Sequence, residues 1–331
     1  MLRCFSAAAS VLILCNALMS DDALAWGASG QRMIGELGAQ SLPAEIPSFL
    51  RTPEAARQIA EVAREADRFT SLDAAHFVEV GDDLKISRGP SLAALPANRE
   101  GYDSALRVAG TNQYRAGYLP YAIIEAWQQL VVDFAYWRAD IAGVKYVRSP
   151  SEQTWFFRDE HIREGLTIRD IGYLAHFVAD GSHPLHVSVH RDGWGNYPNP
   201  QRFSSAKDVL ARFDGAVVRS RITEKDISAL MAPYRDCRCG IERRVAGYLA
   251  ATQKDVTTLY GIEKSGGFDG RQESGKAFAS KRLAAGASEL RDLIVDAWRR
   301  SAEVSIGYPP VAVRDIESGK INALNVLQGV D

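Results

Sequence analysis

The sequence of 331 residues predicts an all-α protein that folds as a single-domain bundle of many helices. Apolar residues recur at helical spacing over long stretches, as in 121–144, where Ile124, Trp127 and Val131 share one face. The alternation typical of β-strands is sparse, and HFVEV at 76–80 is the best candidate for a short extended segment. No repeat, low-complexity tract or linker divides the chain, so we expect one helical domain over residues 26–331.

The order of the helices follows from the same spacing. It predicts helices over 31–41, 53–69, 121–144, 205–220, 223–231, 242–260 and 270–306. Pro53 suits the first position of its helix, and Thr52 is the expected N-cap. Thr167 is expected to cap the helix that holds His176. The polar stretch 81–98, which contains Gly and Pro, is expected to be a loop.

The N-terminus has the pattern of a signal peptide. Arg3 precedes an apolar run over 5–19 that is too short to span a bilayer, and residues 23–25 (ALA) form a small-x-small cleavage site. We therefore expect removal of residues 1–25, with Trp26 as the first residue of an exported protein, periplasmic or secreted. No later stretch is apolar enough to span a membrane, so no membrane partner is expected.

Two cysteines, Cys237 and Cys239, remain after residue 25. An oxidising compartment favours a disulfide between them, although two thiolates could instead bind a metal ion; we favour a local disulfide. The net charge of −2 argues against binding nucleic acid by bulk electrostatic attraction. A nuclease stays compatible with this charge, because bound zinc ions would add positive charge locally.

Residues 170–190 carry the strongest indication of chemistry. Four of the six histidines of the chain lie there, and His176 and Asp180 are four residues apart, which places both on one face of a helix. Gly181 and Pro184 then interrupt the helix before His186. Imidazole and carboxylate groups are the ligands that zinc takes, whereas a buried helix face has no packing reason to carry them. The stretch therefore predicts a metalloenzyme.

Three further residues can join this group: Asp67 in READRF, His76 in AAHFVEV and Asp214 in DVLARFD. Two histidines and two aspartates could complete one tetrahedral zinc site, and His186 with Asp214 could begin a second. Each of these residues taken alone is more often an ordinary polar group.

The new N-terminus completes a pattern. Trp26 would be followed by GASGQRMIG, and with the HxxxD pair of residues 176–180 the chain resembles the S-one/P-one nuclease family of zinc-dependent, single-strand-specific nucleases. Bacterial zinc-dependent phospholipase C is a more distant relation. The resemblance implies up to three zinc ions, of which the first is held by Asp67, His76, His176 and Asp180. Asp180 would bridge to a second ion held by the amine and carbonyl of Trp26, and His186 and Asp214 would hold a third. Asp67 and Asp180 would be the catalytic carboxylates.

The resemblance also implies a substrate and a reaction. Phe77 would stack on a nucleobase, Glu79 would read its edge, and Asn196 in GWGNYPNP would contact the scissile phosphate. The implied activity is endonucleolytic cleavage of single-stranded DNA and RNA that leaves 5′-phosphate ends, with no obligate protein partner.

Two positions depart from the family pattern. Gln31 and Leu210 stand where the family has zinc-binding histidines, so the Trp26 site and the His186 site each lose one imidazole. His183 or His190 could substitute at the His186 site, or both could be surface histidines beside a proline turn. The alternatives to a nuclease are a binding protein of the same fold with partial zinc sites and little catalysis, and a phospholipase C. The pairing of Phe77 with Glu79 argues against the phospholipase.

Overall fold

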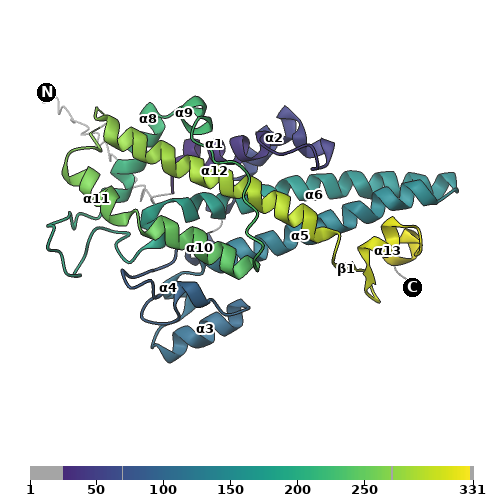
Figure 1. Cartoon of the computed structure of the whole chain (residues 1–331), viewed down its shortest axis with the longest axis horizontal. Coiled ribbons are helices and arrows are strands. Elements are labelled where there is room, and N and C mark those ends of the chain that lie inside the picture. The colour runs from purple at the N-terminus through teal and green to yellow at the C-terminus, as the bar shows by residue number, and fades with distance from the viewer. Residues whose placement is uncertain (1–24, 69, 270, 329–331) are drawn as a thin grey trace, which may run out of the picture.

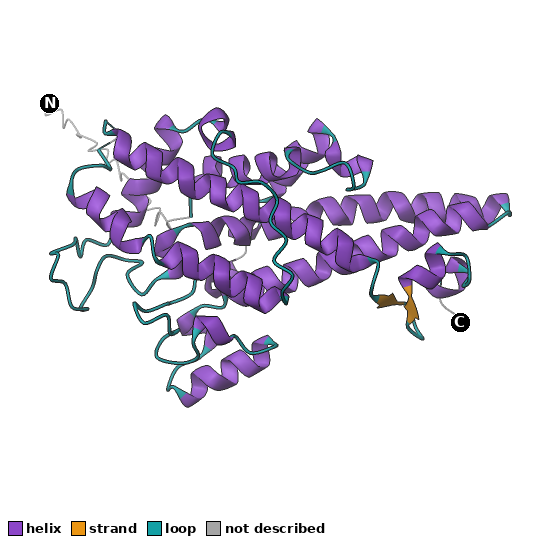
Figure 2. Cartoon of the chain, in the orientation of Figure 1, coloured by secondary structure: helices purple, strands orange, loops and turns teal. Residues whose placement is uncertain are grey.

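The computed structural model describes residues 25–328 except 69 and 270, and it confirms the all-α fold. Figure 2 shows helices throughout, with one small two-stranded sheet. The first half of the chain contains α1 (Gly27–Gln40), α2 (Pro53–Val62), α3 (Arg99–Val108), α4 (Gln113–Ala116), α5 (Leu119–Tyr146) and α6 (Pro150–Ser182). The second half contains α7 (Val209–Arg212), α8 (Arg219–Arg221), α9 (Glu224–Ser228), α10 (Ile241–Gln253), α11 (Val256–Lys264), α12 (Glu273–Ser301), α13 (Val313–Glu317) and α14 (Ala323–Leu327). Among the described residues, no helix is long and apolar enough to cross a bilayer.

The main core lies between α1, α2, α5, α6 and α12. Ile34 of α1, Phe134 of α5 and Leu290 of α12 are completely buried there, and each such side chain contributes about 1.5–3 kcal/mol by leaving water. Figure 1 shows α5 and α6 running side by side, with their far ends projecting beyond the rest of the bundle. The bundle thus holds α6, and the histidines at its end, from several sides.

A second, smaller core lies along the projecting part of α5 and α6. The antiparallel strands β1 (Ser305–Ile306) and β2 (Val311–Ala312) pair Ser305 with Ala312, and they lead into α13 and α14. Val313 and Ile316 pack with Phe156 of α6, and all three are completely buried. This C-terminal segment therefore covers the α5–α6 hairpin (Figure 1).

The helix α2 ends close to α6. Thr52 is its N-cap as predicted, since its hydroxyl accepts a hydrogen bond from the backbone N–H of Ala55 at 3.1 Å. The helix ends at Val62 and not at residue 69. A Cβ on Gly172 of α6 would lie 2.5 Å from the Cβ of Val62, so only glycine permits this approach. The end of α2 leaves backbone carbonyls without partners inside the helix, and the carbonyl of Ala63 is then free to accept a side-chain bond.

Several predicted boundaries are wrong. Thr167 does not cap a helix, because α6 begins at Pro150, and the Thr167 hydroxyl donates inside the helix to the carbonyl of Arg163 at 2.8 Å. The predicted helix 205–220 begins only at Val209 and contains the π-helical turn η6 (Phe213–Val218). The predicted helix 242–260 is two helices, α10 and α11.

The candidate segment 76–80 is extended but forms no regular strand. Its backbone bonds go to separate parts of the chain: Val78 donates to the carbonyl of His186 at 2.8 Å, and Val189 donates to the carbonyl of Val80 at 3.1 Å. These bonds fix the segment that follows His76 against the turn η5 (Pro184–Val187). Cys237 and Cys239 form the local disulfide that the sequence predicts.

Candidate metal centre

Three of the predicted zinc ligands, Asp67, His76 and His176, lie within reach of one another, and the fourth, Asp180, contacts both histidines. His176 and Asp180 lie on α6, Asp67 lies in the short turn η2 (Ala66–Arg68) after α2, and His76 directly follows the turn η3 (Thr70–Ala75). One ligand atom each of Asp67, His76 and His176 lies within 4.8 Å of the others. An Asp180 Oδ2 atom joins them, at 2.9 Å from His76 Nδ1 and 3.2 Å from His176 Nε2. We call these four residues the metal centre.

The hydrogen bonds of His176 orient it as a metal ligand. Its Nδ1 lies 2.6 Å from the carbonyl of Ala63, which can only accept, so Nδ1 carries the proton. Nε2 therefore faces the centre, 2.8 Å from His76 Nδ1 and 3.5 Å from Asp67 Oδ1. Zinc-binding histidines usually donate their second N–H to a carbonyl or carboxylate in this manner.

The electrostatics of the centre favour a positive charge. Burial works against the ionised form of Asp180, yet the attraction of His176, and then of His76, holds the pKa of Asp180 below its usual range. Burial likewise disfavours charged His176, but the attraction of Asp180 and Asp67 raises the pKa of His176 to about 9. Burial raises the pKa of Asp67. Two carboxylates thus lie beside two imidazoles in a largely buried cluster, and a divalent cation suits this donor set.

Gln31 occupies the side of Asp180 where the resemblance implies the second zinc ion. The side chain of Gln31 is completely buried, and its Nε2 donates to Asp180 Oδ1 at 3.1 Å and to the carbonyl of Ala25 at 3.1 Å. An amide N–H cannot bind a metal ion, and Gln31 Oε1 has no hydrogen-bond partner among the described residues. The residues present therefore do not fit an ion at this position.

Trp26 lies beside Gln31 and is completely buried. Its indole Nε1 donates to the carbonyl of Ala179 at 2.9 Å and to the hydroxyl of Ser182 at 2.7 Å, so the ring is fixed against the end of α6. The carbonyl of Trp26 accepts from the N–H of Gly30 at 3.2 Å at the start of α1. Of the predicted signal peptide, residues 1–24 lie outside the described residues.

The predicted pair of His186 and Asp214 is replaced by another pair. Asp214 Oδ1 contacts Nε2 of His183 at 3.2 Å. His183 Nδ1 accepts a bond from the N–H of Leu185 at 3.1 Å, so the proton of a neutral ring is on Nε2 and no lone pair there faces a metal. Leu210 is 2 % exposed and belongs to the apolar core. Of the residues implied for a third zinc site, Leu210 provides no donor and Asp214 contacts His183.

His183 and His190 are both completely buried, so the interpretation of them as surface histidines is wrong. The ring of His190 stacks on Trp194, with 3.8 Å between ring centroids, and His190 contributes to packing. Burial lowers the pKa of His183 and of His186 to about 3, and burial raises the pKa of Asp214. His186 Nδ1 donates to the carbonyl of His76 at 2.7 Å, which leaves its buried Nε2 with no partner among the described residues.

Two of the three predicted substrate residues line a common hollow. Phe77 and Glu79 share a hollow of about 340 Å³ with Arg191, whose guanidinium lies over the Phe77 ring, 4.4 Å from the centroid. Glu79 accepts a bond from the hydroxyl of Ser87 at 2.8 Å. Asn196 is exposed in the loop beyond this hollow. The sequence analysis missed Arg191, because no local pattern shows that it reaches Phe77.

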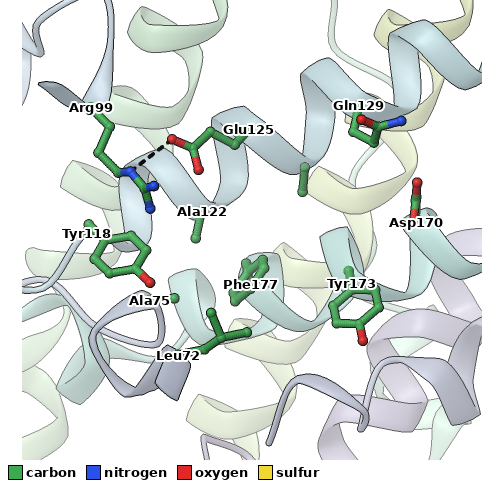
Figure 3. A pocket seen from close by; sticks show the side chains of 11 residues that line it. Leu72, Ala75, Arg99, Tyr118, Ala122, Glu125, Gln129, Asp170, Tyr173 and Phe177 are labelled. Carbon is green, nitrogen blue, oxygen red and sulfur yellow. Dashed lines mark ion pairs between the residues drawn. The ribbon is translucent and has the colours of Figure 1, made fainter. Parts of the chain in front are cut away.

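Phe177 lines a second hollow (Figure 3). Its volume is about 270 Å³, and the ion pair between Arg99 and Glu125, at 3.2 Å, lies at its edge. Its apolar and aromatic lining comes from several segments: Leu72, Ala75, Tyr118, Ala122, Tyr173 and Phe177. The Phe177 ring is 5.8 Å from the ring of His76, centroid to centroid, so this aromatic side chain borders the metal centre. Sequence patterns did not indicate this hollow.

No protein-family model matches this chain, and no curated protein matches it. The resemblance to the single-strand-specific nucleases therefore does not establish the family of this chain.

Proposed function

We propose that this protein binds zinc at the metal centre and hydrolyses phosphodiester bonds of single-stranded nucleic acid. The observation that carries the proposal is the convergence of Asp67, His76, His176 and Asp180, with His176 oriented by the carbonyl of Ala63. Two imidazole nitrogens and two carboxylate oxygens form a donor set that suits tetrahedral zinc. A bound zinc ion would polarise a phosphate and acidify a water molecule.

The residues around the centre have defined tasks in this proposal. Asp180 holds both imidazoles through one oxygen, and the Ala63 carbonyl prevents rotation of His176. The guanidinium of Arg191 lies over the Phe77 ring, so an unpaired base can stack on Phe77 when Arg191 turns from the ring to the backbone phosphate. A double-stranded substrate keeps its bases stacked inside the duplex, so the hollow with Phe77 favours single strands. We take the reaction to leave 5′-phosphate ends and the protein to be exported, on the resemblance and on residues 1–25.

The same side chains support a single zinc ion where the resemblance implies three. Gln31 donates to Asp180, and Leu210 belongs to the core, so the other two positions lack ligands. These two observations also favour the second candidate, an exported zinc-binding protein of the same fold with little catalysis.

Zinc content and cleavage of single-stranded DNA, measured on the same preparations, distinguish the two candidates. We expect about one zinc ion per wild-type chain, and cleavage that stops on chelation and returns with zinc. His176→Ala should lose the zinc and lower cleavage at least about 100-fold, since it removes a zinc ligand and not only a residue that orients a ligand. His161→Ala is the matched control, because His161 lies on the same helix and its side chain is 90 % exposed.

Zinc bound without cleavage would leave only the binding protein. Absence of zinc from the wild-type protein after exposure to excess zinc would contradict both candidates.

A further inference from the structure

A groove of about 620 Å³ lies between α10 and α12, in a part of the molecule to which the proposed function gives no role. The segment 229–240, which joins α9 to α10, crosses α12 and closes one side of the groove (Figure 1). The size is within the range of pockets that hold small molecules.

Small side chains form the floor of the groove. Gly247 and Ala251 lie one turn apart on α10, and Ala284 and Ser288 lie one turn apart on α12. A Cβ added to Gly247 would meet no atom within 4 Å, so the space above it is open. The floor is therefore open above Gly247 and mainly apolar, which suits the body of an organic molecule.

The charges deep in the groove are matched by each other. Arg244 of α10 donates to Glu289 at 2.7 Å and to Asp296 at 2.8 Å, and both acids lie on α12. Arg282 of α12 pairs with Asp255 at 3.2 Å and donates to the hydroxyl of Thr252 on α10. These long side chains join the two helices across the gap and leave no charge of their own for a ligand.

The edge of the groove, in contrast, carries unmatched positive charge. Arg235 of the crossing segment, Arg243 of α10 and Lys281 of α12 are exposed, and none of their side chains makes an ion pair or hydrogen bond with another described residue. The nearby Asp236 is 3.6 Å from Arg238 and so has a cation of its own. Three cations from three segments thus surround one groove in a chain whose net charge is −2.

We propose that the groove between α10 and α12 binds a small organic phosphate. The apolar body of the ligand lies on the floor around Gly247, and the phosphate dianion binds to Arg235, Arg243 and Lys281. Arginine and lysine are the usual side chains that bind phosphate. A phosphate dianion can contact several cations on different sides, whereas a carboxylate has one charge and two oxygens. The proposal does not depend on the nuclease, because none of these residues belongs to the metal centre.

The test is equilibrium binding of 1-naphthyl phosphate, followed by its fluorescence, with 1-naphthol and inorganic phosphate as partial ligands. We expect saturable binding of the whole probe and much weaker binding of either part. His176→Ala should bind the probe as the wild-type protein does, so a failure of the metal centre and a failure of the groove are distinguishable.

Two variants address the groove itself. The double variant Arg243→Glu/Lys281→Glu should bind at least about tenfold more weakly, since two attractive charges become repulsive. Its matched control is Lys145→Glu/Arg158→Glu, which makes the same charge change at exposed cations of the α5–α6 hairpin without carboxylate partners among the described residues. Gly247→Leu should fold at least as stably, because leucine favours helix over glycine, and should lose the probe by filling the floor.

Three results would overturn the proposal: no saturable binding of 1-naphthyl phosphate, equal weakening in the control pair, or unchanged binding in Gly247→Leu. Binding of a thymidine oligonucleotide without binding of 1-naphthyl phosphate would also overturn it, because the cations would then contact a strand.

Discussion

Replacing Gln31 by histidine tests whether its amide stands where a second zinc ligand would act. The buried Nε2 of Gln31 donates to Asp180 Oδ1 at 3.1 Å, and this bond remains when Ala25, the second acceptor of the amide, is removed with the predicted signal peptide. Gln31→His removes the bond to Asp180. A buried acceptor left without its donor costs about 1–3 kcal/mol, so the metal-free variant should unfold more easily by that amount.

Zinc should reverse this loss. The new imidazole and Asp180 Oδ1 would provide two ligands for a further ion, and an ion present at about 100 times its Kd stabilises the folded chain by about 2.7 kcal/mol. We therefore expect Gln31→His to be less stable than the wild-type protein in chelator, and about equal to it in zinc. The zinc content should rise from about one to about two ions per chain.

The assay is urea denaturation followed by tryptophan fluorescence, with elemental analysis of the same samples. Gln40→His is the control, because Gln40 lies on the same helix but is exposed, and it should change neither stability nor zinc content. If Gln31→His were as stable as the wild-type protein in chelator, the hydrogen bond from the Gln31 amide to Asp180 would not contribute to the free energy of unfolding. If its zinc content stayed unchanged, position 31 would not match the histidine of the family pattern.

Three further predictions concern other residues. Burial, then Asp159, raises the pKa of Asp140 from 3.8 to about 8, so the ionised unfolded state gains on the folded state as pH rises through this window. Asp140→Asn should therefore stabilise the metal-free protein in urea denaturation by up to about 5 kcal/mol near pH 8 and by less than about 1 kcal/mol near pH 4. Glu100→Gln, at an exposed position, should show no such pH dependence, and a destabilised Asp140→Asn at pH 8 would mean that Asp140 is ionised and paired. Arg191→Ala should raise the KM for single-stranded DNA without changing zinc content, because Arg191 lies over Phe77 and outside the metal centre; loss of zinc would contradict this placement. Leu210→His should lower the free energy of unfolding by about 2–5 kcal/mol in chelator, because it places a polar ring in the apolar core; unchanged stability would mean that position 210 is not packed as described.

Local patterns were sufficient for the fold class and for one part of the metal centre. The apolar spacing of 121–144 predicted α5, and Thr52 before Pro53 predicted the start of α2, because both depend only on neighbours in the chain. The pair His176 and Asp180 was predictable for the same reason, since helical geometry alone places both on one face.

The predictions that were wrong concern features that depend on contacts beyond the local sequence pattern. Thr167 has the residue type of a cap, but the chain is already helical from Pro150 and its hydroxyl bonds inside α6. At the end of α2, Val62 approaches Gly172 of α6 closely, and no local pattern shows this contact. The choice of His183 as the partner of Asp214 depends on which ring nitrogen carries the proton, and the N–H of Leu185 decides that.

The two departures from the family pattern are consistent with each other in physical terms. A buried carboxylate needs a cation or a donor at its oxygens. At Asp180 the amide of Gln31 is that donor, and at Asp214 it is the Nε2–H of His183, while burial favours the protonated form of Asp214. Both carboxyl groups thus have a donor without the second and third ions, and among the described residues Asp180 Oδ2 contacts the imidazoles of His76 and His176. Under the proposed function, a centre arranged in this way would need only one ion, and catalysis would depend on that ion together with Phe77 and Arg191.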